Sequence, residues 1–221
     1  MTTPAPCILL TGFEPFGGES VNPSWEIARA LDGWSCEGHV VHAALLPCAF
    51  GDALVALDAA IEAHAPRIVL CLGQAGGRPE ISIERVAVNV DDARIPDNRG
   101  RQPIDMAIEA CGPAAYFSTL PIKAIARDVR EAGAAASVSN TAGTFVCNHV
   151  FYALMHRVAT RPGLARARAG FVHVPYTPGQ VAGRVDVPSM PLAMQVAGIR
   201  QALRTAVQVR VDARENAGRE H

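Results

Sequence analysis

The chain has 221 residues, with 20 basic and 21 acidic side chains and a formal net charge of −1. This length fits one domain with a sizeable core, and the balanced charge argues against a nucleic-acid or membrane-surface partner. Six scattered cysteines without a C-x-x-C pair, no basic signal segment and no apolar run of ~18 residues together predict a cytoplasmic protein without disulfides or a zinc ribbon.

The first half of the sequence predicts strands that alternate with helices. An apolar run typical of a strand covered on both faces comes first. A helix follows it, because Asn22 and Pro23 are a favourable N-cap and first helical residue. Apolar periodicity then predicts a second strand, a second helix and a third strand. The expected elements are strand Cys7–Thr11, helix 23–31, strand His39–Leu46, helix 50–65 and strand Arg67–Leu72.

The second half continues this alternation, with two irregular segments. Ile81–Val90 resembles a strand whose inward face changes near Glu84 and Arg85, which indicates a bulge or an edge-to-interior transition. The segment from Asp91 to Pro103 is long for a simple connection, so we expect a functional loop. The remaining expected elements are strand Ala115–Leu120, helix 121–129, strand Ala136–Ser139, helix 147–159, strand Phe171–Val174 and helix 192–203.

This order of elements predicts the fold class. Repeated strand–helix alternation is typical of a three-layer α/β/α sandwich with a mixed, mostly parallel, twisted sheet. We expect a single catalytic domain over residues 1–209. Residues 210–221 have no periodicity and few apolar side chains, so they are expected to form a frayed tail.

The segment Asn140–His149 carries the strongest chemical signal, because Cys147 falls where an amphipathic helix begins. The helix dipole and the unpaired N–H groups of the first turn stabilise a thiolate and can bring its pKa to ~3.5–7.5. The same N–H groups can hold an oxyanion. The alternative is a small buried cysteine that packs the start of the helix.

A cysteine nucleophile needs a base. His149 is a poor candidate, because two positions along a helix turn its side chain about 200° away from Cys147. His173 is a polar residue inside an apolar strand that Pro175 closes. In open α/β sheets, sites assemble at the carboxyl ends of strands, where the helix bearing Cys147 is also expected to start. A core histidine with satisfied hydrogen bonds is the alternative.

The acid that orients the base is expected on another strand. Glu84 is the one carboxylate in its strand, and a buried carboxylate needs a partner such as an imidazolium. A salt bridge to Arg85 or to another cation is equally compatible with the sequence. The predicted arrangement is Glu84 orienting His173, which activates Cys147.

Long motifs along nearly the whole chain give the sequence a resemblance to a known family. It resembles the pyroglutamyl-peptidase I (pyrrolidone-carboxylate peptidase) family of cytosolic cysteine exopeptidases. The motifs that carry this resemblance are Leu10–Gly18, Val21–Trp25, Gly73–Arg78, Ile83–Asn89, Ala93–Asn98, Ser139–His149 and Gly170–Tyr176.

The resemblance implies an enzyme that removes an N-terminal pyroglutamyl residue from peptides through a thioester, with a Glu84–Cys147–His173 triad and no metal or cofactor. It implies that Phe13 and Phe16 sandwich the pyroglutamyl ring. An apolar, aromatic slot suits this neutral lactam, and its recognition needs no carboxylate. Other positions implied to line the pocket or the oxyanion site are Gln74, Arg94, Ile95, Phe145 and Val146. Cys48 departs from the family pattern at the pocket edge. The family also implies a homo-oligomer, namely a tetramer.

Two rival functions remain open at this point. The glycine-rich segment Gly73–Arg78 could cradle a phosphate in a nucleotide- or phosphate-binding α/β protein, although it has neither G-x-G-x-x-G nor a G-K-[ST] ending. An inactive relative that only binds ligands is the other rival. The presence of Cys147, His173 and Glu84 together speaks against it.

Overall fold

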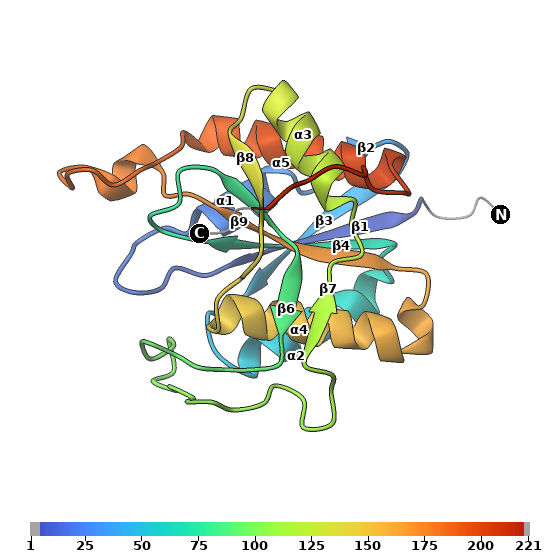
Figure 1. Cartoon of the computed structure of the whole chain (residues 1–221), viewed down its shortest axis with the longest axis horizontal. Helices are drawn as coiled ribbons and strands as arrows, with labels where there is room; N and C mark the ends of the chain where they lie inside the picture. Colours follow the sequence, from blue (N-terminus) through green and yellow to red (C-terminus); the bar gives the residue numbers. More distant parts are fainter. Residues whose placement is uncertain (1–4, 219–221) are drawn as a thin grey trace.

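A seven-stranded sheet forms the centre of the computed structural model, which describes residues 5–218 (Figure 1). The strands lie in the order β2-β3-β1-β4-β9-β5-β8. Their bounds are β1 Cys7–Phe13, β2 Ser35–Cys36, β3 His39–Leu46, β4 Ile68–Gln74, β5 Ile81–Glu84, β8 Ala136–Ser139 and β9 Arg168–Val174. A separate antiparallel pair is formed by β6 (Val86–Val88) and β7 (Ala115–Phe117).

Helices cover both faces of the sheet, as expected for a three-layer α/β/α sandwich (Figure 1). One face packs against α1 (Pro23–Ala30), α3 (Ile122–Glu131) and α5 (Leu192–Gln208). The other face packs against α2 (Asp52–His64) and α4 (Val146–Thr160). Among residues 5–218, no helix is both long and apolar enough to cross a lipid bilayer.

Strand direction divides the sheet into two parts. The strands β3, β1, β4 and β9 are mutually parallel, whereas β5 pairs with β9 in the antiparallel sense. β8 runs parallel to β5, and β2 is antiparallel to β3. The predicted mixed, mostly parallel sheet is therefore confirmed. Its reversal between β9 and β5 is a feature that alternation of elements along the sequence does not reveal.

The expected change of face near Glu84 is larger than a bulge. The predicted strand Ile81–Val90 is two strands in two different sheets, and it breaks at Arg85. Arg85 N–H donates to Ser139 O, while Ser118 N–H donates to Arg85 O. The chain therefore leaves the main sheet after Glu84 and joins β7 beside α4.

The segment between Asp91 and Pro103 contains no helix or strand, and a few long-range contacts hold it in place. The Asp97 carboxylate accepts hydrogen bonds from the N–H groups of Phe50, Arg99 and Arg101. His149 Nδ1 lies 2.8 Å from Asp91 Oδ2, and its Nε2 accepts from Gly51 N–H at 3.1 Å. These bonds fasten the loop to the start of α2 and to α4.

The C-terminal segment also has specific contacts. Residues 210–218 contain no helix or strand, but the Asp212 carboxylate accepts hydrogen bonds from Lys123 N–H and Ala124 N–H in the first turn of α3. The N-cap of α3 is Pro121, which makes no side-chain cap. Asp212 thus takes over the capping of α3 from outside the helix. Of the predicted frayed tail, residues 219–221 lie outside the described residues.

Replacement of Asp212 by alanine tests this cap. The substitution removes the acceptor for two N–H groups and a negative charge beside the positive end of α3, so we expect it to lower the free energy of unfolding by about 0.5–2 kcal/mol. Chemical denaturation measures the effect. Glu62→Ala, which removes an exposed carboxylate on α2, is the control and should change stability by less than ~0.5 kcal/mol. Equal stability of the two variants would contradict the cap.

Candidate active site

Cys147 lies in the first turn of α4, as the sequence predicts. The helix starts at Val146, and its N-cap residue Phe145 makes no side-chain hydrogen bond to the first turn. A phenylalanine has no oxygen with which to accept from these N–H groups, so the cap leaves the donors of Val146 and Cys147 free of a side-chain partner. They are available for an oxyanion formed next to the sulfur.

The sulfur of Cys147 lies against the sheet at Gly73. A Cβ atom on Gly73 would approach Cys147 Sγ to 2.7 Å and Phe171 Cζ to 2.8 Å, so only glycine leaves space here. Gly73 is the register partner of His173 across the β4–β9 pair. Side chains of register partners point to the same face of a sheet, and therefore His173 projects to the face on which the sulfur lies.

Glu84 faces the same side of the sheet and meets the imidazole. His173 Nδ1 lies 2.8 Å from Glu84 Oε1, and both side chains are buried, with Glu84 fully inaccessible. Because an ionised carboxylate oxygen only accepts hydrogen bonds, Nδ1 donates in this contact, and Nε2 is then the nitrogen that carries the lone pair in a neutral ring. A neutral ring held in this way can act as a base at Nε2. Of the alternatives left open by the sequence, a salt bridge from Glu84 to Arg85 is not present in the described structure, whereas one to another cation, Arg78, is present together with the imidazole contact.

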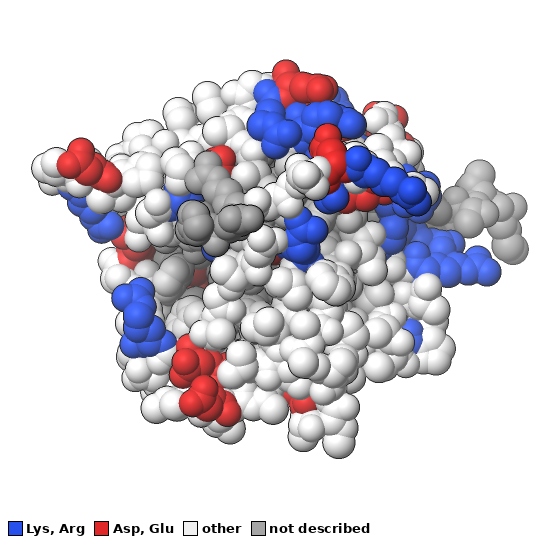
Figure 2. Space-filling view, viewed as in Figure 1, with Lys and Arg blue, Asp and Glu red and all other residues white. Residues whose placement is uncertain are grey.

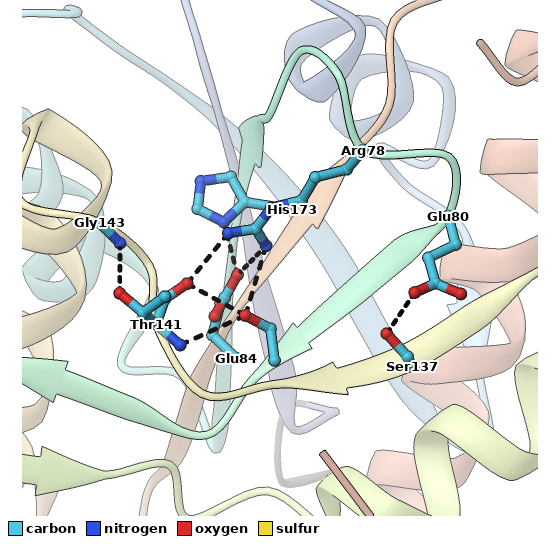
Figure 3. Close-up of polar contacts among 8 residues, drawn as sticks. Arg78, Glu80, Glu84, Ser137, Thr141, Gly143 and His173 are labelled. Carbon is cyan, nitrogen blue, oxygen red and sulfur yellow. Dashed lines mark hydrogen bonds and ion pairs between the residues drawn. The ribbon is translucent and has the colours of Figure 1, made fainter. Parts of the chain in front are cut away.

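Arg78 is the cation that neutralises Glu84, and sequence reasoning missed it (Figure 3). Its Nη1 donates to Glu84 Oε1 at 2.6 Å, and its Nη2 donates to the backbone oxygen of Thr141 at 3.0 Å. Arg78 therefore joins the acid to the loop that leads into α4. Its place at the end of the glycine-rich motif was the available signal, but a loop arginine has no sequence feature that identifies its partner.

The antiparallel step in the sheet changes how these groups meet. His173 is near the carboxyl end of β9, and the Cys147 sulfur lies against Gly73 near the carboxyl end of β4. Glu84 is the last residue of β5, and the loop before Cys147 follows β8; both of these strands run the other way. The sequence analysis placed only His173 and the helix start at the carboxyl ends of strands, and it did not reveal that Glu84 comes from a strand of the opposite direction. The three groups meet on the face of the sheet that α4 covers.

A small cavity of about 170 Å³ opens between these groups. Its size is below the ~300–1,000 Å³ that holds a drug-sized ligand, so it suits a single small ring. Asn22 and Gln74 are polar members of the wall, and among residues 5–218 no Asp, Glu, Lys or Arg side chain belongs to it. The lining residues are Phe13, Phe16, Asn22, Cys48, Gln74, Ala142, Phe145, Cys147 and His173.

The predicted pocket residues are thus only partly brought together. Phe13, Phe16, Gln74 and Phe145 line the cavity, and the rings of Phe16 and Phe145 lie 6.3 Å apart. Val146 is fully buried in the core behind the helix start, so its side chain does not line the cavity.

Two further predicted residues lie apart from the cavity. Arg94 and Ile95 are exposed on the loop from Asp91 to Pro103 and are not part of the cavity wall. Their contribution to substrate binding stays a prediction. Asn22 and Ala142 line the cavity although the sequence analysis did not select them, and Cys48 forms part of the wall at the expected pocket edge. The sequence predicts Asn22 only as a helix cap. It also has this structural role, because its side chain accepts a hydrogen bond from Ser24 N–H.

The environment of Cys147 acts against a permanent thiolate. Burial raises the pKa of the Cys147 thiol well above its usual value, nearby Cys48 and Glu84 add to the rise, and Arg78 opposes it. This direction is opposite to the lowering that the helix start predicts. Desolvation of the charged sulfur outweighs the dipole, so the resting thiol is neutral and must give its proton to a base when it reacts.

The glycine-rich segment does not form a phosphate cradle. Gly73 faces the sulfur of Cys147, and a Cβ on Gly76 would lie 2.2 Å from Cζ of Tyr176. Arg78 is engaged with Glu84 and Thr141. The small residues here allow close packing around the site.

Comparison with known proteins gives a consistent result. The family model described as pyroglutamyl peptidase matches residues 7–209. The chain is similar to a pyrrolidone-carboxylate peptidase of Cupriavidus taiwanensis, with 57% identity over 98% of this chain and 100% of that protein. It is also similar to the one of Bacillus cytotoxicus, with 50% identity over 97% and 99%. The crystal structure of pyroglutamyl peptidase I from Bacillus amyloliquefaciens has a TM-score of 0.93 and 43% identity, and covers 96% of this chain and 100% of that chain.

The raised pKa of the Cys147 thiol leads to a pH prediction. A thiol whose pKa is raised is neutral near pH 7 and gains thiolate character as the pH rises. We therefore expect the rate of alkylation of Cys147 by iodoacetamide to increase steadily between about pH 6 and 9. Peptide mass spectrometry separates Cys147 from the exposed Cys111, which serves as the internal reference. A pH-independent plateau of the rate across neutral pH would indicate a stable thiolate–imidazolium pair and contradict this expectation.

Proposed function

The chain belongs to the pyroglutamyl peptidase family of cysteine peptidases, which remove an N-terminal pyroglutamyl residue, and we propose that Cys147, His173 and Glu84 perform this reaction. One observation carries the assignment of residues. A cysteine at a helix start and a histidine bonded to a buried glutamate at 2.8 Å line the same small cavity. The rival phosphate-binding and inactive-relative hypotheses have no support from the site or from the related proteins.

The cavity wall fits the chemistry of the substrate end group. A pyroglutamyl residue ends in a neutral lactam, which has no free amine and needs no carboxylate to bind it. Phe13, Phe16 and Phe145 supply apolar area, and Asn22 and Gln74 offer polar atoms that can orient the lactam. A peptide with a free N-terminal amine would place a positive charge in this cavity without a counter-charge. The cost of desolvating that ammonium group excludes such a peptide.

The first chemical step is attack of sulfur on the pyroglutamyl carbonyl carbon. His173 Nε2 accepts the thiol proton as the S–C bond forms, since the resting thiol is neutral. The carbonyl oxygen becomes an oxyanion, and the N–H groups at the start of α4 stabilise it. Glu84 holds the Nδ1–H of His173 and favours the imidazolium that results.

Collapse of the tetrahedral intermediate breaks the amide bond. The imidazolium of His173 gives its proton to the departing amine, and the pyroglutamyl group remains on Cys147 as a thioester. His173 then removes a proton from water, which attacks the thioester and releases pyroglutamate with return of the proton to sulfur. Peptide and water are therefore the only reactants that the two steps consume.

We further propose a cytoplasmic location and a homotetramer, both of which the family resemblance favours. The cytoplasmic proposal is supported by the six cysteines, all of which are free thiols in the described structure. Figure 2 shows basic and acidic side chains interspersed on the face in view, which agrees with the near-zero net charge and with the absence of nucleic acid among the proposed partners. Sedimentation of the full chain measures the oligomeric state.

Hydrolysis of a pyroglutamyl–aminocoumarin substrate tests the triad. Cys147→Ala and His173→Ala are expected to lower kcat/KM by ~10⁴-fold or more, and Glu84→Gln by a smaller factor. Cys111→Ser, which replaces an exposed thiol outside the cavity, should keep full activity. Prolyl–aminocoumarin, whose ring carries an amine in place of the lactam, should not be cleaved. Retained activity in the folded Cys147→Ala or His173→Ala variant would reject the assigned roles.

The role of Arg78 is tested by Arg78→Met and Arg78→Lys. Methionine leaves Glu84 buried beside His173 without its cation and releases the loop at Thr141. We expect kcat to fall by about 10–100-fold, with little change in KM because Arg78 is outside the cavity wall. Lysine keeps the charge and should restore part of kcat.

Arg166→Met removes an exposed arginine elsewhere and is the matched control for Arg78→Met. It should leave both constants unchanged. A rise of KM alone in Arg78→Met would show that Arg78 acts on substrate binding and would contradict the positioning role. Equal kcat values for the methionine and lysine variants would show that the charge is unimportant.

A further inference from the structure

A second group of chemically active side chains lies at the opposite ends of the strands from the active site. Cys7 is the first residue of β1, whose last residue, Phe13, lines the active-site cavity. Six steps along a strand correspond to roughly 20 Å. His64 is likewise the last residue of α2, the helix whose first turn lies near the active-site loops. Neither residue belongs to the site described above.

Three regular elements bring Cys7, His42 and His64 together. In the parallel β1–β3 pair, His42 is the register partner of Leu9, which lies two residues from Cys7 and thus on the same face of the sheet. Helix α2 packs on that face and ends with His64. The chain then returns through Arg67, whose N–H donates to the backbone oxygen of Cys7 at 2.8 Å. The convergence is fixed by strand register and helix length and does not depend on a long loop.

The three donor atoms are close enough to share one ion. Cys7 Sγ and one nitrogen from each histidine all lie within 4.8 Å of one another. The ring centroids of His42 and His64 are 4.3 Å apart, with an angle of 17° between the planes. A neutral imidazole nitrogen offers a lone pair in the plane of its ring. Because the two rings are nearly parallel, one of them would have to turn about its side-chain bonds for both nitrogens to bind the same ion.

These donors have no other partner in the part of the chain that the structure describes. Between residues 5 and 218, no hydrogen bond or ion pair joins the sulfur of Cys7 or the ring nitrogens of His42 and His64 to another group. Cys7 is buried, with 7% of its surface exposed, and both histidines are half-buried. The sulfur is shielded from water while both imidazoles stay reachable from solvent, so the convergence of the three donors at one point suits an ion that enters from solvent.

We propose that Cys7, His42 and His64 form a binding site for one borderline-soft transition-metal ion of the Zn²⁺ class. A thiolate with two imidazoles is a donor set that Zn²⁺ and its neighbours prefer, whereas Mg²⁺ and Ca²⁺ prefer oxygen. Three protein ligands leave a fourth tetrahedral position for water. Binding deprotonates the thiol, so one proton passes to solvent for each ion bound. The ion would fasten the start of β1 to β3 and to the end of α2.

Titration with Co²⁺ tests the site by spectroscopy. The protein is the full chain without an affinity tag, kept reduced, and it carries Cys147→Ser so that the active-site thiol cannot bind metal. We expect one Co²⁺ per chain, visible d–d bands of tetrahedral cobalt and a sulfur-to-cobalt charge-transfer band. Zn²⁺ should displace the cobalt and abolish these bands.

Single substitutions in this background assign the ligands. Cys7→Ser should remove the charge-transfer band. His42→Gln or His64→Gln should weaken Co²⁺ binding by at least about tenfold, because loss of a group that merely hydrogen-bonds to a metal ligand already weakens metal binding by that factor. His39→Gln is the matched control. It lies three residues before His42 on the same strand, its Nδ1 faces the backbone oxygen of Glu37, and its removal should leave the titration unchanged.

Thermal unfolding tests the site even if one of these variants folds poorly. Zn²⁺ should raise the Tm of the Cys147→Ser protein by mass action, and this rise should be absent in His64→Gln, which changes only a half-buried residue at a helix end. The proposal is overturned if the tetrahedral cobalt spectrum does not appear, if the charge-transfer band survives in Cys7→Ser, or if His39→Gln weakens binding as much as His42→Gln does.

Discussion

The buried carboxylate of Glu84 is the constraint on which the active site depends. Its side chain is fully inaccessible, and one oxygen, Oε1, meets both His173 Nδ1 and Arg78 Nη1, whereas Oε2 has no partner among the described residues. Desolvation of a carboxylate is costly, and a buried ion pair seldom returns the whole cost. The arrangement is therefore better explained by the reaction than by stability. It fixes the tautomer of His173 and couples three chain segments.

The direction of the strands determines how these segments meet. Because β5 and β8 run against β9, the loop after β8 carries the start of α4 back over the face of the sheet. The sulfur then rests against Gly73 on β4, where no side chain can fit between helix and sheet. The small cavity in front of the sulfur follows from this close approach. Its restricted volume matches an enzyme that accepts one terminal ring.

Two thiols at opposite ends of the sheet illustrate how environment sets reactivity. Burial raises the pKa of both Cys7, to about 11, and Cys147. A neutral buried thiol is inert unless something takes its proton. At Cys147, the proposed base is His173, which lies beside the N–H donors of the helix start. At Cys7, the neighbours are two stacked imidazoles, and a metal ion would be the agent that ionises the sulfur.

The sequence by itself determined the class of fold, most elements and the residues proposed for catalysis, because local periodicity and long motifs are properties of neighbouring residues. It could not determine that β5 is antiparallel to β9, that Arg78 reaches Glu84, or that His42 meets Cys7 and His64. These contacts join segments far apart in the chain, and only the register of strands and the packing of helices bring them together. The pKa direction of Cys147 was likewise decided by tertiary structure, since burial depends on every element around the sulfur.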